Sequence, residues 1–150
     1  MTNVISMLDI STKVSVLAVS GDAKELKRLQ CLFRGSSWGL CTARTLAEAR
    51  EWLNRNETPI ILCDSRLPDG DWKGLFRLTA DLDRSPSFII ISRLADERLW
   101  SELLNLGGHD VLALPAKPSE LFGTLSNAWR SWKGRFEREP AAQKRHACSG

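Results

Sequence analysis

Asp64 is the residue of this chain best placed to do chemistry. It closes the apolar run 59–63 and is followed at once by the turn-rich segment 65–71. A short continuous apolar run bounded by turn residues is typical of a fully buried strand. The carboxylate then lies where a strand gives way to a loop, which is where ligands and reactive groups collect in open α/β sheets. A carboxylate in that place can also serve simply as an acceptor for backbone N–H groups of its own loop.

Other polar residues follow apolar runs in the same way. Ser20 and Asp22 come at the end of the run 14–19, and Ser92 closes the run 88–91. Because parallel strands end at one edge of a sheet, we expect these side chains to gather at the same edge. Ser92 can also be an ordinary cap of its strand end.

The elements that must bring these residues together alternate between strands and helices. Near-continuous apolar runs predict buried strands, and apolar residues at helical spacing predict the helices between them. The expected strands are 14–20, 39–43, 59–64, 88–92 and 110–114, and the expected helices are 23–33, 46–54, 73–83, 95–106 and 119–133. With right-handed crossovers, this order predicts an α/β fold: a flavodoxin-like, doubly wound five-stranded parallel sheet with strand order 2-1-3-4-5 and helices on both faces.

Two of the expected helices begin with a capping pair. Asp22 is followed three residues later by Glu25, and Thr45 by Glu48. An acidic residue three positions after a capping side chain is a signature of a helix start.

Length and composition indicate one ordinary globular domain. The chain has 150 residues, of which 43% are hydrophobic and 26% charged. No stretch reaches the roughly 18 apolar residues needed to cross a bilayer, and the start of the chain lacks the pattern of a secretion signal. We therefore expect a cytoplasmic protein that makes no membrane contact. Cysteines 31, 41 and 63 fall within expected elements, which indicates buried free thiols, as does the lack of metal-ligand spacing.

Positive charge is concentrated at the end of the chain. The formal net charge is +3, and basic residues outnumber acidic ones from residue 130 onward. We expect residues 1–12 to be a leader, residues 13–133 a domain, and residues 134–150 a basic, disordered tail. Glu is interleaved with Lys and Arg in this tail, so nucleic acid is not an expected partner.

Four signals stand in a fixed order within residues 13–133. Asp64 ends its strand, Pro68 stands four residues later before an Asp-Gly-Asp loop, Ser92 closes the next strand, and the sequence Gly-Gly-His-Asp-Val-Leu leads to Pro115. Each signal is weak alone. Their order and spacing resemble the receiver domain of two-component response regulators, which has the fold predicted above.

The resemblance implies a role for each matching position. Asp64 would accept a phosphoryl group from a histidine kinase in a phosphorelay. Mg²⁺ would be held by Asp64, by two acidic residues after the first strand and by the backbone carbonyl of Arg66. A hydroxyl at Ser92 would contact the phosphate, and a lysine before Pro115 would pair with it. Phosphoryl transfer depends on positioning and on neutralising charge, so the metal and the lysine supply most of the catalysis.

The chain departs from the family's pattern at several positions. The acidic pair falls on Ser20 and Gly21, the lysine on Leu114, and the aromatic residue that reports phosphorylation on Val111. Trp72 stands where the family usually has glycine. These degenerate positions put both the metal site and the switch in doubt.

The missing residues are linked by charge. Their loss removes two negative charges and one positive charge, and it leaves one carboxylate that nearby hydrogen-bond donors can satisfy. We therefore infer a pocket rebuilt to stand without metal. Asp22 could still turn in as a metal ligand, although helix capping is the more ordinary use. Lys117, Arg66 and Arg93 could bring positive charge to the rim, or be solvated loop cations.

Six tryptophans are many for this composition. Trp100 and Trp129 fall on the last two helices, where leucines can already fill the inward faces. Receiver domains commonly pair through these helices, and large aromatic residues anchor such interfaces. These two tryptophans are therefore candidates for a homodimer or partner surface, or else they fill the edges of the core.

We expect a stand-alone, atypical receiver (a pseudo-receiver) that is a signalling module and not an enzyme. Its expected partners are a histidine kinase or another signalling protein. Asp64 is either phosphorylated with reduced metal dependence or, as we favour, left unphosphorylated while the surface carries the signal. The alternative is a flavodoxin-like small-molecule or nucleotide-binding enzyme. The first strand lacks a phosphate-cradling glycine-rich loop, and His109 and His146 have no evident nucleophile partner, so this alternative is the weaker one.

Overall fold

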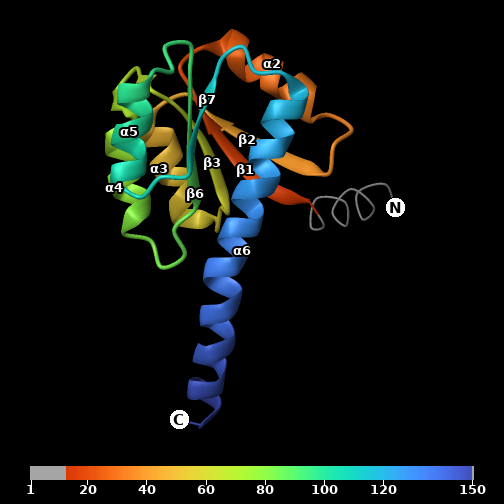
Figure 1. Ribbon diagram of the computed structural model, residues 1–150, viewed down its shortest axis with the longest axis vertical. Coiled ribbons are helices and arrows are strands. Elements are labelled where there is room, and N and C mark those ends of the chain that lie inside the picture. The colour runs from red at the N-terminus through yellow and green to blue at the C-terminus, as the bar shows by residue number, and fades with distance from the viewer. Residues whose placement is uncertain (1–12, 150) are drawn as a thin grey trace.

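A five-stranded parallel sheet forms the centre of the molecule (Figure 1). The computed structural model describes residues 13–149, with side chains for residues 13–136. The strands are β1 (Val14–Val19), β2 (Trp38–Ala43), β3 (Ile60–Asp64), β6 (Ser87–Ser92) and β7 (Asp110–Ala113). Their order across the sheet is β2-β1-β3-β6-β7. Since β6 and β7 are the fourth and fifth strands of this sheet along the chain, the predicted flavodoxin-like fold and the order 2-1-3-4-5 are confirmed.

Helices cover both faces of the sheet. They are α2 (Ala23–Phe33), α3 (Leu46–Arg55), α4 (Trp72–Ala80), α5 (Glu97–Asn105) and α6 (Pro118–Ser149). Alternate residues of β1, β3 and β6 point to opposite faces, and they form two cores. One core lies under α2 and α6, and the other under α3, α4 and α5 (Figure 1).

The three central strands are buried on both sides. Residues 16–19 of β1 and 60–63 of β3 have no exposed surface. A parallel strand in this position has to be apolar along its whole length, which explains the continuous runs in the sequence. Polar side chains are accommodated where the strands end.

Each helix from α2 to α5 begins with a side chain that caps its N-terminus. Asp22 accepts from the N–H groups of Lys24 and Glu25. Thr45, Asp71 and Asp96 cap α3, α4 and α5 in the same way. The pair Thr45 and Glu48 is confirmed as a start of α3, because Glu48 also accepts from the N–H of Arg44.

The structure differs from the sequence prediction in its last helix. α6 was expected to end near residue 133, and it continues to Ser149 and extends well beyond the sheet (Figure 1). Trp132 and Phe136 are both buried, so the helix is still packed on the domain at the expected end. The later residues include several alanines and long charged side chains, which favour helix.

The division into a leader, a domain and a tail stays a prediction. The leader, residues 1–12, lies outside the described residues. Within the described range, no helix is both long and apolar enough to span a bilayer.

The expectation for the cysteines is partly wrong. Cys63 is buried and Cys41 is half-buried, but Cys31 is exposed; these three are free thiols. Cys31 stands between Leu29 and Phe33, which both face the core, and a residue two positions from each lies on the opposite side of a helix.

A two-stranded hairpin after β3 was not predicted. β4 (Arg66–Leu67) pairs with β5 (Gly70–Asp71). The tip of this hairpin is tied to a helix: the Asp69 carboxylate accepts from the N–H groups of Leu46, at 2.7 Å, and Ala47, at 3.0 Å. The loop that follows Asp64 is therefore fixed to the first turn of α3.

This contact makes stability depend on pH. The hydrogen bond from Leu46, together with that from Ala47, lowers the pKa of Asp69 below its ordinary 3.8. A lowered pKa contributes stability above the ordinary value, and this contribution is lost as the pH falls through the folded-state pKa. We expect Asp69→Asn to lower the thermal midpoint at neutral pH. When the pH drops below 3.8, the thermal midpoint of Asp69→Asn should fall by less than that of the native chain. Circular dichroism melts measure this.

Asp83→Asn serves as the control, because Asp83 is exposed and makes no hydrogen bond or ion pair with residues 13–136. An equal acid sensitivity in Asp69→Asn and the native chain would contradict the assigned role of Asp69.

Candidate functional site

The residues predicted to form a site meet at the carboxyl edge of the sheet. β3 ends at Asp64, which is half-buried and lies beside Ile91 of β6 in the parallel register. Ser20 directly follows β1, and Ser92 closes β6. The edge places a carboxylate and two hydroxyls at the ends of adjacent strands, as the sequence predicted.

The carboxylate of Asp64 is held by neutral hydrogen-bond donors. Ser20 Oγ donates to Asp64 Oδ2 at 3.0 Å, and the N–H of Arg66 donates to Oδ1 at 3.4 Å. Ser20 is fully buried, and its hydroxyl oxygen also accepts from the N–H of Asp22. A neutral donor therefore stands at the position where the receiver pattern has the first acidic residue.

Gly21, at the second position of that acidic pair, leaves no room for a side chain. A Cβ there would lie 2.8 Å from Cγ and 2.9 Å from Cδ of Pro68. Both distances are shorter than real contacts, and the pyrrolidine ring cannot bend away. The loop after β3 has closed over the place that an acidic side chain would need.

Ser92 is turned to its own loop and to Ser65. Its Oγ accepts from the N–H of Leu94 at 3.0 Å and shares a hydrogen bond with Ser65 Oγ at 3.1 Å. Within residues 13–136 it makes no hydrogen bond to Asp64. In this structure Ser92 caps the end of its strand. Contact between Ser92 and a phosphate stays a prediction.

The remaining family positions are occupied by apolar residues. Leu114, at the lysine position, is half-buried against the core under α2 and α6. Val111, at the aromatic position, packs against the other core. Neither position supplies a charge or a polar group to Asp64.

One of the cations predicted at the rim, Arg93, forms an ion pair with Glu25. Its guanidinium lies 3.7 Å from Glu25 Oε1. Lys117 is exposed, and it makes no ion pair within residues 13–136. The side chain of Arg66 is exposed as well, although its backbone folds back on Asp64.

Glu25 is a feature of the site that the sequence did not reveal. Only 2% of its surface is exposed, and Arg28 and Arg93 lie 3.6 and 3.7 Å from its two carboxylate oxygens. Arg28 also donates to the carbonyl of Ala116 at 2.6 Å. Sequence reasoning assigned Glu25 only a capping role with Asp22, whereas the spacing of Glu25 and Arg28 on one helix face was the signal for an ion pair.

This ion-paired group joins three parts of the rim. Glu25 and Arg28 belong to α2, Arg93 to the loop after β6, and Ala116 to the loop after β7. A buried carboxylate is costly unless cations accompany it, so the two arginines have to stay near it. The group therefore links the two loops to α2, through ion pairs in which no described side chain donates a hydrogen bond to Glu25.

The residues present do not fit the Mg²⁺ site that the family resemblance implies. Asp64 has both oxygens engaged, and Asp22 caps its own helix. Among residues 13–136 no three acidic, histidine or cysteine side chains come together as a metal site. Mg²⁺ needs several hard oxygen ligands in octahedral geometry, and within residues 13–136 no group of acidic side chains around Asp64 supplies such a set.

Cys63, next to Asp64, is an inert neighbour. Burial, with the charges of Asp64 and Asp71 added, raises the pKa of its thiol well above the ordinary 9.0. The thiol stays protonated at neutral pH and donates to the carbonyl of Asp64. It is not a reactive nucleophile.

The close approach of Pro68 to Gly21 predicts the effect of a small substitution. Gly21→Ala should destabilise the domain by about 1–3 kcal/mol, because the new Cβ overlaps the proline ring. Gly39→Ala is the matched control, since its Cβ would lie at ordinary contact distance, 3.6 Å from Lys13 Cβ. Urea unfolding measures both, and equal stabilities of the two variants would contradict the steric argument.

Comparisons with known proteins agree with this fold. No protein-family model matches the chain. It is 30% identical over 123 residues to the swarming motility regulation protein RssB of Serratia marcescens, a match that covers 81% of this chain and 55% of that protein. The chain thus spans about half the length of this curated relative.

Solved structures give the same fold. The signal receiver domain of an HD domain-containing protein from Pseudomonas fluorescens Pf-5 is 24% identical with a TM-score of 0.77, covering 85% of this chain and 94% of that one. An adenylate cyclase structure from Rhodopirellula baltica is 16% identical with a TM-score of 0.80, covering 88% and 98%. Several others are response regulators or their receiver domains. The chain therefore has the fold of signal receiver domains, with Asp64 closing β3 of its sheet, and it is similar in sequence to part of a response regulator.

Proposed function

We propose that this receiver domain takes part in two-component signalling through protein contacts, without depending on phosphorylation of Asp64. The observation that carries the proposal is the hydrogen bond from Ser20 to Asp64, at 3.0 Å. It supplies a neutral donor where a phosphorylated receiver would have a metal-binding acid. In this proposal the domain has no catalytic activity of its own.

The charge balance of the site supports the proposal. A phosphoryl group on Asp64 would add negative charge at the edge of the sheet, where phosphoryl transfer requires a metal or a lysine to neutralise it. Leu114 brings no charge, and Arg93 is paired with Glu25. Restoring the second acidic residue at position 21 would require Pro68 to move.

The fixed loops give the proposal a mechanical basis. A phosphoryl group that acted through Ser92, as the resemblance implies, would have to move the loop after β6. Here that loop is held by Arg93 on Glu25 and by Ser92 on Ser65. The domain would then present one stable surface to a histidine kinase or another signalling protein.

The test is incubation with Mg²⁺ and acetyl phosphate, followed by intact-mass measurement, with beryllofluoride and NMR as a second readout. We expect no mass gain and no Mg²⁺-dependent spectral change, because the site lacks the charges that stabilise transfer. Asp64→Ala is the control. A metal-dependent mass gain that disappears in Asp64→Ala would overturn the proposal in favour of a phosphorylated receiver.

The contact surface in this proposal lies on and beside α5. The large hydrophobic side chains that are exposed within residues 13–136 all fall between 94 and 106: Leu94, Trp100, Leu104 and Leu106. Trp100 and Leu104 stand four positions apart on α5, and therefore on one helix face. Such a grouping is typical of a protein interface.

Trp129 has a different environment from Trp100. It is half-buried, stacks on Trp132 with ring centroids 5.5 Å apart, and has Lys133 over its ring. We propose that two copies of the domain form a dimer through this surface. Trp100 lies at the centre of the dimer interface, and Trp129 lies at its edge. α5 and α6 lie on either side of the edge strand β7, so both can reach the same partner (Figure 1).

Trp100→Ala should weaken self-association, because 48% of this side chain is exposed and truncation removes an anchor without disturbing the core. Sedimentation velocity over a range of protein concentrations measures the dimer. Arg77→Ala on the exposed face of α4 is the control. Equal dimer dissociation constants for Trp100→Ala and the native chain would contradict this surface.

A further inference from the structure

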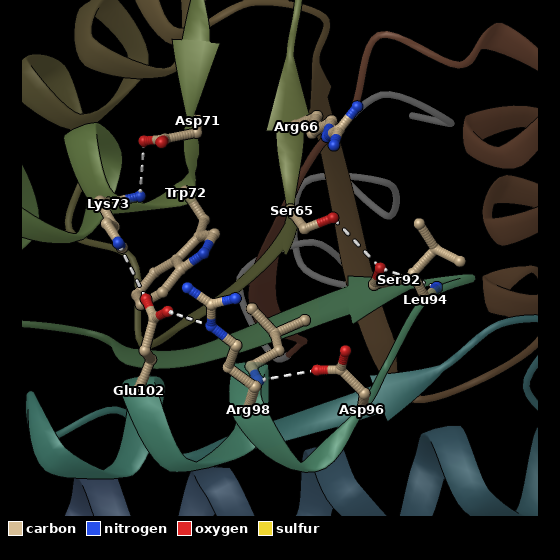
Figure 2. A pocket seen from close by; sticks show the side chains of 11 residues that line it. Ser65, Arg66, Asp71, Trp72, Lys73, Ser92, Leu94, Asp96, Arg98 and Glu102 are labelled. Atoms are coloured by element: carbon tan, nitrogen blue, oxygen red, sulfur yellow. Dashed lines mark hydrogen bonds and ion pairs between the residues drawn. The ribbon is translucent and has the colours of Figure 1, made fainter.

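A pocket of about 340 Å³ lies beside Ser92, between the β4–β5 hairpin, the start of α4 and the start of α5 (Figure 2). Asp64 is not among its lining residues. The size is at the lower end of the range for small-molecule sites. We propose that this pocket binds a small molecule through an oxyanion group, a carboxylate or a phosphate, independently of Asp64.

The first support is an unpaired donor in the wall. Trp72 is 4% exposed, and its indole N–H makes no hydrogen bond with residues 13–136. The nitrogen still has some surface, because it is absent from the fully enclosed unsatisfied atoms of the described side chains. Buried tryptophans usually find a partner for this N–H group. Trp72 lines the pocket (Figure 2), so an oxyanion bound there would replace water as the acceptor for this N–H group.

The second support is an unpaired cation at the rim. The guanidinium of Arg66 makes no ion pair or hydrogen bond with residues 13–136. Arginine presents a planar set of donors that matches carboxylate and phosphate oxygens. Arg66 extends from β4 on the same side of the pocket as Ser65 (Figure 2).

The hydroxyl pair supplies a further donor. Ser65 and Ser92 share one hydrogen bond, and Ser92 Oγ also accepts from the N–H of Leu94. Two hydroxyl protons are present and the shared bond uses one of them. Whichever serine donates to the other, the second proton is left for a ligand.

Each acidic residue in the wall meets at least one donor, and within residues 13–136 Asp71 and Asp96 do so through Oδ1 alone. Asp71 and Asp96 accept from backbone N–H groups as the caps of α4 and α5. Glu102 pairs with Lys73 at 2.8 Å and with Arg98 at 3.9 Å. The donors that the described residues leave unused include the Trp72 indole N–H, the Arg66 guanidinium and one serine proton, and an oxyanion offers acceptors to all three.

The apolar part of the wall limits the rest of the ligand. Leu94 and Leu99 line the pocket next to the donors, and Leu94 is 75% exposed. An aliphatic portion of the ligand could cover Leu94, while its oxyanion reaches Arg66 and Trp72. Both α4 and α5 begin at this pocket, so the positive ends of their dipoles also favour an anion.

The test follows the indole N–H resonance of Trp72 by NMR, identified with Trp72→Phe. The full chain is titrated separately with inorganic phosphate and with succinate, at constant ionic strength set with chloride. We expect a saturable shift with at least one of them, and the stronger of the two shows which oxyanion the pocket prefers. Arg66→Gln should weaken the affinity by about tenfold, which corresponds to about 1.4 kcal/mol.

Three further variants test whether the anion binds in this pocket. Arg77→Gln removes the same charge from an exposed position on α4 outside the pocket, and should change nothing. Ser65→Ala should weaken binding through loss of the hydroxyl. Asp64→Asn should leave binding intact, which separates this site from the phosphoacceptor position and from the outcome of the acetyl phosphate experiment. The absence of a saturable shift with both anions, or a shift that Arg66→Gln leaves unchanged, would overturn the proposal.

Discussion

The burial of β1, β3 and β6 on both faces is the constraint from which the rest of the structure follows. A strand enclosed by two layers of helices has no place for a polar side chain along its length. Every group capable of chemistry is therefore displaced to the ends of the strands. Ser20, Asp64 and Ser92 lie together at one edge because the parallel sheet permits polar residues there, and each of them is met by a hydrogen-bond partner from the adjoining loops.

Charge at this edge is balanced in a different way from the receiver pattern that the sequence resembles. The carboxylate of Asp64 is stabilised by hydrogen bonds from the Ser20 hydroxyl and the backbone N–H of Arg66, and within residues 13–136 it forms no ion pair. Two of the cations near this edge, Arg28 and Arg93, lie beside Glu25. The residues at positions 21 and 114 are consistent with one another, since an acid restored at position 21 would overlap Pro68 and Leu114 would bring it no counter-charge.

The sequence predicted those features that depend on local pattern. The strands and α2 were placed nearly to the residue, because their apolar residues follow the strand and helix periods and capping residues mark the helix starts. Asp64 and Ser92 were located because strand ends are visible as the limits of apolar runs. The hydrogen bond from Ser20 to Asp64 depends on the register of β1 against β3, which no local pattern records.

Other features escaped prediction for similar reasons. Glu25 has the sequence context of an exposed capping residue, and its burial results from Arg93, which is distant along the chain. The contact of Asp69 with α3 joins two loops whose proximity follows from the crossover. The length of α6 was underestimated because the run of basic residues suggested a solvated tail, while the aromatic side chains of Trp132 and Phe136 continue to bury surface there.

The contact between Asp69 and the first turn of α3 has a consequence for motion. The segment from Ser65 to Asp71 connects the carboxylate at the end of β3 to a helix on the outer layer. If this segment shifts, the N-terminus of α3 loses two acceptors at once and begins to fray. Whether the N-terminus of α3 is ordered would then depend on the position of the loop 65–71. A change at the carboxyl edge of the sheet can in this way alter α3, which itself makes no hydrogen bond with Asp64.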